Sequence, residues 1–142
     1  MKKIFITGFS SNISKEFIKL TKNNKQFKII KCGKSKDSDI NVDFSSMQST
    51  AKFIKYILKN KPSYLLICHG VLHGLKIADL KEKHFESSVS INMSSIIYIL
   101  ENITKIKELN AVVISSISGK KGSYDNLYAS SKAGLNLVVK SI

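Results

Sequence analysis

Short apolar runs alternate with amphipathic stretches along the whole chain. The runs cover residues 4–6, 27–33, 39–44, 63–70 and 110–116, and each is short enough to predict a β-strand. The segments between most of them carry apolar residues three or four positions apart, which is the spacing of a helix face. Strands that alternate with helices in this way predict βαβ units and a parallel sheet.

Each helical segment is predicted to turn one apolar stripe toward the sheet. The predicted stripes are Ile13, Phe17, Leu20 and Thr21 in the first helix; Phe53, Ile54, Ile57 and Leu58 in the second; and Val89, Met93, Ile96, Ile97, Leu100 and Ile103 in the third. A last helix is expected to begin near Asn126 and to carry Leu135 and Val139 on the same side as Tyr128 and Lys132. The alternation therefore continues to the last residues of the sequence.

Length and composition fit one ordinary domain of 142 residues. A hydrophobic content of 43% and a charged content of 23% are typical of globular proteins. No apolar run approaches the roughly 18 residues of a membrane span, and no cleavage site follows the first lysines. We expect a cytoplasmic domain without a membrane partner. Cys32, Cys68 and three dispersed histidines lack the spacing of a metal site.

The net charge of +13 and a pI near 9.8 raise the question of nucleic-acid binding. All 23 basic residues are lysines, so the arginine fork that reads guanine or clamps phosphate is absent. The lysines are also scattered along the chain. We interpret them as a solvated surface and expect no nucleic-acid partner.

Residues 7–14 read TGFSSNIS and predict a turn from a strand into a helix. Free N–H groups and the helix dipole at such a position can bind a phosphate. A dinucleotide-binding turn usually has three glycines, but only Gly8 is present, and Asn12 and Ser14 stand where the other two are expected. A serine-rich helix cap without a ligand explains this stretch equally well.

Residues 114–132 read ISSISGKKGSYDNLYASSK and place a tyrosine and a lysine on one helix face. With the TG turn at 7–8, Asp43, the CHG turn at 68–70 and Asn92, this segment resembles the short-chain dehydrogenase/reductase family. The resemblance implies a Rossmann-like three-layer α/β/α sandwich with parallel strands in the order 3-2-1-4-5. It also implies an oxidoreductase that binds NADP or NAD and moves a hydride between the nicotinamide and a carbonyl or alcohol.

The same resemblance assigns four catalytic roles. Ser116 corresponds to the hydroxyl that orients the substrate carbonyl, and Tyr128 to the proton donor or acceptor. Lys132 would stabilise the phenolate and bind the nicotinamide ribose, while Asn92 would bend its helix and hold a water that leads to the lysine. A nearby positive charge supports this chemistry, because a tyrosine hydroxyl is a poor base at neutral pH without one.

The predicted cofactor site lies at the ends of the first four strands. No acidic residue follows the second strand to bond the ribose of NAD, and Lys34 can meet the 2′-phosphate of NADP, so we favour NADP. Asp43 matches the family residue at the adenine; its alternative role is a helix cap. His69 is expected to pack beside the cofactor. The predicted cofactor-binding residues are Thr7, Gly8, Ser10, Ser11, Asn12, Ile13, Lys34, Asp43, Phe44, Cys68, His69, Gly70, Tyr128 and Lys132.

Two departures from the family pattern bear on activity. The first is Asn12, whose side chain would occupy space that the pyrophosphate needs. The second is the ending LVVKSI, which stops inside a helical pattern without a cap, whereas family members continue through further strands. We expect a fragment or a truncated member with its last strands missing. A degenerate member that binds nucleotide or a partner subunit without catalysis is the alternative.

The resemblance further implies self-association. In the family, the helices that correspond to those of Asn92 and Tyr128 pack against their symmetry mates. Both helices carry apolar residues outside the predicted inner stripes, and together these would form a large exposed patch. These residues are Ile91, Ile99 and Ile106 on the first helix and Leu137 and Val138 on the second.

Overall fold

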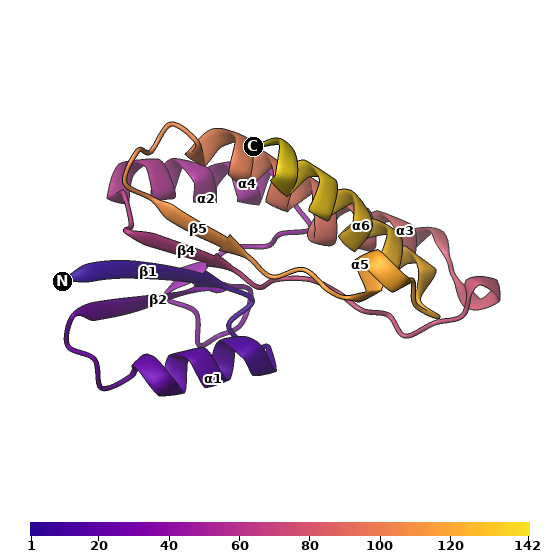
Figure 1. Ribbon diagram of the computed structural model, residues 1–142, viewed down its shortest axis with the longest axis horizontal. Coiled ribbons are helices and arrows are strands. Elements are labelled where there is room, and N and C mark those ends of the chain that lie inside the picture. The colour runs from indigo at the N-terminus through magenta and orange to yellow at the C-terminus, as the bar shows by residue number, and fades with distance from the viewer.

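The computed structural model describes residues 1–142 and contains one parallel five-stranded sheet (Figure 1). Its strands are β1 (Lys2–Thr7), β2 (Phe27–Gly33), β3 (Ile40–Asn41), β4 (Tyr64–Ile67) and β5 (Asn110–Val113). They lie in the order β3-β2-β1-β4-β5, which confirms the predicted order. The direction of strand addition reverses between β1 and β4, and open α/β sheets bind ligands in the crevice at such a point.

The helices lie on both faces of the sheet. In Figure 1, α1 (Asn12–Thr21) lies alone below it, and α2 (Met47–Asn60), α4 (Ser95–Ile103) and α6 (Asn126–Ser141) lie above it. Right-handed crossovers explain this division, because the β1–β2 connection runs one way along the sheet and the β3–β4 and β4–β5 connections run the other way. Short helices occur at Ile77–Asp79, at α3 (Glu82–Val89) and at α5 (Ser118–Lys121).

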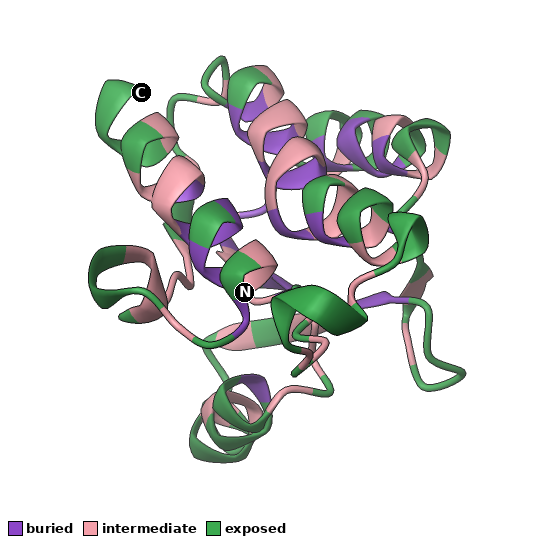
Figure 2. Cartoon of the chain, turned by 90° about the vertical axis from the view of Figure 1, so that its right-hand side faces the viewer, coloured by how far each residue is buried: buried purple, intermediate pink, exposed green.

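The core lies between the sheet and the three long helices on one face. Phe5, Leu65 and Ile67 of the strands are all at most 1% exposed, and they belong to one cluster with residues of α2, α4 and α6. The helix residues of the cluster are Phe53, Ile54, Ile57, Ile96, Ile99, Leu100, Ile103 and Leu135. Figure 2 shows buried positions, in purple, on one side of the long helices, whereas α1 at the bottom is mostly green and pink.

The predicted inner stripe of the third helix is wrong at two positions. Val89 is 45% exposed, and Ile99, predicted to lie outside the stripe, is fully buried. The cause is a π-helical turn, Ser90–Ser94, between α3 and α4. Its i→i+5 hydrogen bonds add a residue to the turn and rotate the face that follows, so one 3.6-residue pattern cannot describe the whole helix. Because Ile99 is in the core, it cannot contribute to the predicted dimer patch.

The first helix also departs from its predicted stripe. Ile13 and Leu20 are 56% and 82% exposed, and the buried residue of α1 is Ser14. Since α1 is the single helix on its face of the sheet, no second helix covers its flank. Smaller departures occur at Leu58 and Val139, which lie at the edges of their stripes and are partly exposed.

Two strands are shorter than predicted. β3 covers only Ile40–Asn41, and β5 ends at Val113, opposite the last residue of β4. The outer edge of β5 has no neighbouring strand, and Val112 there is 52% exposed. Ser115 and Ser116 consequently lie in the loop beyond the strand. None of the helices is long and apolar enough to cross a membrane.

Replacing Ile99 by alanine tests the rotated helix face. We expect the free energy of unfolding to fall by about 2–5 kcal/mol, because the side chain leaves a cavity in the core. The matched control is Leu20→Ala, which removes an exposed side chain and should change the stability by about 0.5 kcal/mol or less. Chemical denaturation measures both values. Equal effects of the two substitutions would contradict the rotated face.

Candidate active site

A cleft of about 420 Å³ lies at the carboxyl ends of β1, β2 and β4. Most of the predicted cofactor-binding residues line it: Gly8, Ser10, Ser11, Lys34, Asp43, Phe44, Cys68, His69 and Gly70. Phe9, Gly33, Ser35, Val42 and Ile91 complete the lining and were not predicted from the sequence. Thr7 is buried beneath the cleft, whereas Asn12 and Ile13 are exposed beside it.

The turn from β1 into α1 requires a glycine at its first position. Gly8 has a φ of +61°, and a Cβ there would lie 2.6 Å from the backbone of His69. Serines take over the contacts further along the turn: Ser14 Oγ donates to the Gly8 carbonyl at 3.0 Å, and the Ser14 amide donates to Ser11 Oγ at 3.2 Å. The amides of Asn12 and Ile13 donate to no protein acceptor. These two N–H groups can therefore bind an anion.

His69 connects three elements beneath the cleft. Its Nδ1 lies 2.7 Å from Thr7 Oγ1, and its Nε2 lies 3.0 Å from Ser95 Oγ. Because the Ser95 hydroxyl donates to the carbonyl of Ile91, it must accept from Nε2–H, which leaves Nδ1 to accept from Thr7. Burial, with a smaller effect of the Lys132 charge, lowers the pKa of His69 to about 3. The imidazole is thus neutral and has one defined tautomer.

The ring of His69 also supports the wall of the cleft. It stacks on Phe44 with ring centroids 3.8 Å apart and an interplanar angle of 4°. Phe44 in turn contacts Phe53 of α2 edge-on, at 5.6 Å. The predicted packing of His69 beside the cofactor site is consistent with this position, and the stack holds Phe44 in place beside Asp43.

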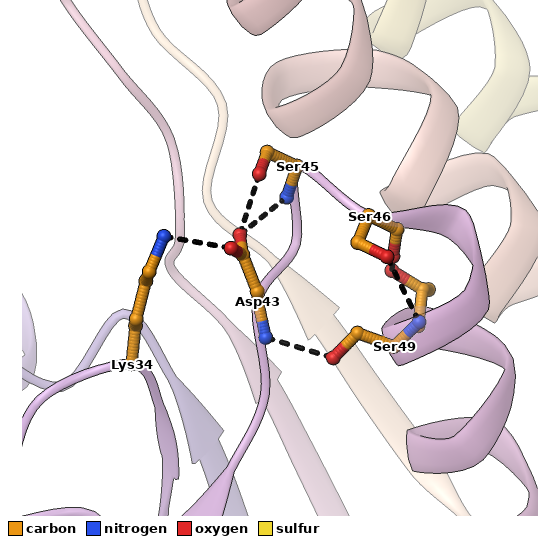
Figure 3. Close-up of polar contacts among 6 residues, drawn as sticks. Lys34, Asp43, Ser45, Ser46 and Ser49 are labelled. Atoms are coloured by element: carbon orange, nitrogen blue, oxygen red, sulfur yellow. Dashed lines mark hydrogen bonds and ion pairs between the residues drawn. The ribbon is translucent and has the colours of Figure 1, made fainter.

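Lys34 and Asp43 form an ion pair at the lip of the cleft (Figure 3). Lys34 Nζ lies 2.7 Å from Asp43 Oδ2. The hydrogen bond from Lys34, followed by that from the Ser45 hydroxyl, lowers the pKa of Asp43 to about 2. Asp43 does not cap α2, since Ser46 does so by accepting from the Ser49 amide at 3.2 Å. The predicted alternative role of Asp43 as a helix cap is therefore wrong.

Tyr128 and Lys132 lie one turn apart on α6, as predicted. The Lys132 side chain is almost fully buried, with 3% of the residue exposed, and its ammonium lies 5.6 Å from the centroid of the Tyr128 ring. Its hydrogen-bond acceptor is the carbonyl of Ile114, at 3.3 Å. Burial lowers the pKa of Lys132, and the nearby Cys68 opposes this shift. A buried charge with one partner can interact strongly with a neighbouring phenol.

Asn92 joins the catalytic helix to the end of β4. Its amide oxygen accepts from the Val71 amide at 2.6 Å, and its Nδ2 donates to the Val71 carbonyl at 2.9 Å and to Ser131 Oγ at 3.3 Å. Gly70 lies between these groups: a Cβ there would be 3.2 Å from Asn92 Oδ1 and 3.6 Å from Lys132 Nζ. Asn92 is fully buried in the π-helical turn, where the backbone distortion accompanies these bonds.

Ser116 is the predicted catalytic residue with the weakest connection to the others. Its hydroxyl accepts from the Ser118 amide at 3.2 Å, and no hydrogen bond joins it to Tyr128. The neighbouring Ser115 instead donates to Asn136 at 2.6 Å, on a groove between β5 and α6. The structure thus brings Gly70, Asn92 and Lys132 together beside Tyr128, and it leaves the Ser116 hydroxyl outside this hydrogen-bonded group.

The comparisons with known proteins agree with this arrangement. A family model described as short chain dehydrogenase matches residues 13–142. The chain belongs to the short-chain dehydrogenase family. A search of curated proteins finds no match. Solved structures of similar fold include a short chain dehydrogenase family protein from Francisella tularensis subsp. tularensis SCHU S4, with 20% identity and a TM-score of 0.81.

Two further similar structures carry a nicotinamide cofactor in their names. A variant of actinorhodin polyketide ketoreductase with NADPH has 16% identity and a TM-score of 0.81, and 4-hydroxyisoleucine dehydrogenase complexed with NADH has 23% and 0.81. In each of the three comparisons the match covers 99% of this chain, but only 62%, 63% and 67% of the Francisella protein, the ketoreductase and the dehydrogenase. The likeness establishes the fold over this shared part.

One residue of this short-chain dehydrogenase was missed from the sequence. Asp125 is fully buried; its Oδ1 accepts from the Tyr128 amide at 3.0 Å, and its Oδ2 accepts from the amides of His73 and Gly74 at 3.1 and 2.9 Å. Burial acts to raise the pKa of Asp125, but these three donors outweigh it and lower the pKa. An aspartate just before a predicted helix signals an N-cap, but the loop contact has no local signal.

Substitution of Asp125 should loosen both the catalytic helix and the loop at residues 73–74. Asp125→Ala removes the cap and leaves two N–H groups of the loop unpaired, so we expect a loss of about 1–3 kcal/mol in unfolding free energy. Asp125→Asn keeps two acceptor lone pairs and should lose less. The control is Asp79→Asn on the exposed surface. Denaturation and amide exchange at His73 and Gly74 measure the effect; protection of these amides unchanged in Asp125→Ala would contradict it.

Acid should destabilise the fold through His69. The pKa of His69 is about 3 in the folded protein and 6.5 in a free chain, so the unfolded state binds an extra proton between these values. This contribution to stability is complete above about pH 6.5 and is lost as the pH falls toward about 3. The free energy of unfolding should decrease by up to about 1.4 kcal/mol per pH unit in this window.

Urea unfolding between about pH 4 and 7 measures this slope. His69→Gln should flatten it, because no buried imidazole remains to be protonated. His84→Gln, at a partly exposed histidine, is the control and should retain most of the slope. A slope of the same size in His69→Gln and the unmodified protein would exclude His69 as its source.

Proposed function

We propose that this chain is the cofactor-binding and catalytic part of an NAD(P)-dependent oxidoreductase, with NADP preferred, which acts on a carbonyl or alcohol. The observation that carries the proposal is the buried ammonium of Lys132 beside the ring of Tyr128. A lysine costs free energy to bury, and this one has a single carbonyl acceptor in the protein. A phenol that exchanges protons at this place gives the buried charge a use.

The residues present fit a dinucleotide. Gly8 lets the backbone turn closely, and the amides of Asn12 and Ile13 are free to hold the pyrophosphate. Asp43 and Phe44 border the adenosine side of the cleft, and Lys34 follows the strand at which the ribose is recognised. Asn12 is exposed, so its side chain can turn away from a phosphate. When bound, the nicotinamide would supply or accept the hydride.

The protein residues would manage the proton of the substrate oxygen. Tyr128 donates its hydroxyl proton to the oxygen in reduction and accepts it in oxidation. Lys132 stabilises the resulting phenolate through its charge, which the surrounding protein screens weakly. Asn92 keeps Gly70 and α6 in register, so that Lys132 stays beside Tyr128. Ser116 would orient the substrate oxygen after its hydroxyl turns toward the cleft.

A member that binds nucleotide without catalysis is the second candidate. It is favoured by the replacement of two turn glycines by Asn12 and Ser14, by the absence of a hydrogen bond between Ser116 and Tyr128, and by the partial coverage of the related structures. In either case we propose that residues 1–142 act as one cofactor-binding domain. Self-association through the helices of Asn92 and Tyr128 would rely on Leu137, which is 69% exposed, since Ile99 is buried.

Substitutions at residues 128 and 132 separate the two candidates. In a preparation that reduces a carbonyl with NADPH, Tyr128→Phe should lower kcat by about 10²–10⁴-fold and leave cofactor affinity nearly unchanged, because only the proton donor is lost. Lys132→Ala should reduce both kcat and cofactor affinity. Tyr124→Phe, at a tyrosine 67% exposed, is the matched control and should retain activity.

Steady-state kinetics and fluorescence titration with NADPH give the two quantities. Near-normal turnover by Tyr128→Phe would exclude Tyr128 as the acid/base residue. NADPH binding without turnover in the unmodified chain would favour the nucleotide-binding candidate. Failure of both NADPH and NADH to bind would contradict both.

A further inference from the structure

The carboxylate of Asp43 is held in place independently of Lys34. Its Oδ1 accepts from the Ser45 amide at 3.0 Å and from the Ser45 hydroxyl at 2.6 Å, and its own amide donates to Ser49 Oγ at 2.9 Å (Figure 3). Oδ2 is left for Lys34. If Lys34 moved away, these other bonds would keep the carboxylate where it is, at the start of the loop that leads into α2.

Lys34 is the mobile partner of the pair. Its side chain is 74% exposed, against 33% for Asp43, and its ammonium makes no other hydrogen bond or ion pair. A lysine is a point charge on a flexible stem, so its ammonium can reach a new partner without movement of the backbone. An ion pair this exposed contributes at most about a fivefold factor to an equilibrium constant. The pair is therefore easy to exchange.

The two residues border the same part of the cleft, with Ser35 and Ser10 beside them. Lys34 directly follows the end of β2, the strand end at which the 2′ position of the adenosine ribose is recognised in this fold. A 2′-phosphate at that place would be a stronger acceptor for the ammonium than one carboxylate oxygen, because it offers more charge and three oxygens. A 2′-hydroxyl offers no such replacement.

We propose that Asp43 and the 2′-phosphate of NADP(H) compete for Lys34, so that the preference for NADPH over NADH is set by an exchange of the lysine's ionic partner. The proposal rests on the proposed function. NADPH binding opens the pair, and NADH binding leaves it closed. Asp43 thus weakens the preference for NADPH that Lys34 provides, and both residues determine cofactor specificity from opposite sides.

A double-mutant cycle on the 142-residue chain tests the exchange. Dissociation constants for NADPH and NADH are measured by fluorescence titration for the unmodified protein, Lys34→Ala, Asp43→Asn and the double variant. Asp43→Asn should raise the NADPH-to-NADH affinity ratio by about two- to fivefold, because Lys34 is released. In the Lys34→Ala background the same substitution should leave the ratio unchanged. The ratio cancels any adenine contact that both cofactors lose with Asp43.

A second readout follows Asp43 directly. Since the Lys34 hydrogen bond is the largest cause that lowers the pKa of Asp43 to about 2, loss of that bond should raise it. Carboxyl NMR titration should show this rise on saturation with NADPH or with adenosine 2′,5′-bisphosphate, and not with NADH. Lys34→Ala should show it without nucleotide. Lys36→Ala, at an exposed lysine two positions away, is the control and should change neither readout.

The outcomes separate this inference from the proposed function. A ratio that does not rise in Asp43→Asn, or that rises equally in the Lys34→Ala background, overturns the exchange while nicotinamide binding stands. A pKa of Asp43 that NADPH does not raise also overturns it. If neither cofactor binds any of the four proteins, the proposed function fails, and the exchange, which rests on it, fails with it. A rise in the ratio confined to the Lys34 background, with the NADPH-specific rise in pKa, supports the exchange.

Discussion

The active-site geometry depends on the burial of one amide, the side chain of Asn92. Its hydrogen bonds to Val71 and Ser131 connect the end of β4 to the catalytic helix, and a buried amide without such partners would cost free energy. The π-helical turn that holds Asn92 is a local distortion of a long helix, which packed surroundings must stabilise. The position of Lys132 beside Tyr128 follows from this connection, since α6 is held against the turn next to Gly70.

Burial sets the chemistry of the two basic side chains beneath the cleft in opposite ways. His69 is neutral, because desolvation removes its charge and two hydroxyl groups satisfy both ring nitrogens. Lys132 is buried with few partners, so its charge acts over a short distance on what lies next to it. The neutral imidazole therefore builds the floor of the cofactor cleft, while the ammonium stays available for the phenol. Both side chains lower the free energy of the site only while the surrounding packing keeps water away.

The sheet carries helices unequally, and this affects what the described part of the protein can do. Three long helices cover one face, and α1 alone lies on the other, with Leu20 largely exposed. The related structures extend beyond the shared part by about a third of their length. The cofactor cleft is nevertheless formed by residues of β1, β2, β4 and the loops that follow them, within the shared part. Nucleotide binding is thus the property that these residues can provide by themselves.

Local sequence determined much of the fold and part of the site. Alternating apolar runs predicted the parallel strands, and the bounds of β2 and the start of α6 agree with prediction because strand length, caps and helical spacing are encoded by neighbouring residues. The four-residue spacing of Tyr128 and Lys132 likewise fixed their common face. These features need no contact with distant parts of the chain.

Tertiary structure decided the rest. The π-helical turn rotated the face of α4 and buried Ile99, and Asp125 found its loop partners 51 and 52 residues away. The tautomer of His69 depends on hydroxyl groups of β1 and α4, and the pairing of Lys34 with Asp43 depends on where two loops meet. Such contacts are set by packing between elements rather than by periodicity within one. The sequence therefore determined which groups were present, and only the packed structure decided which of them meet.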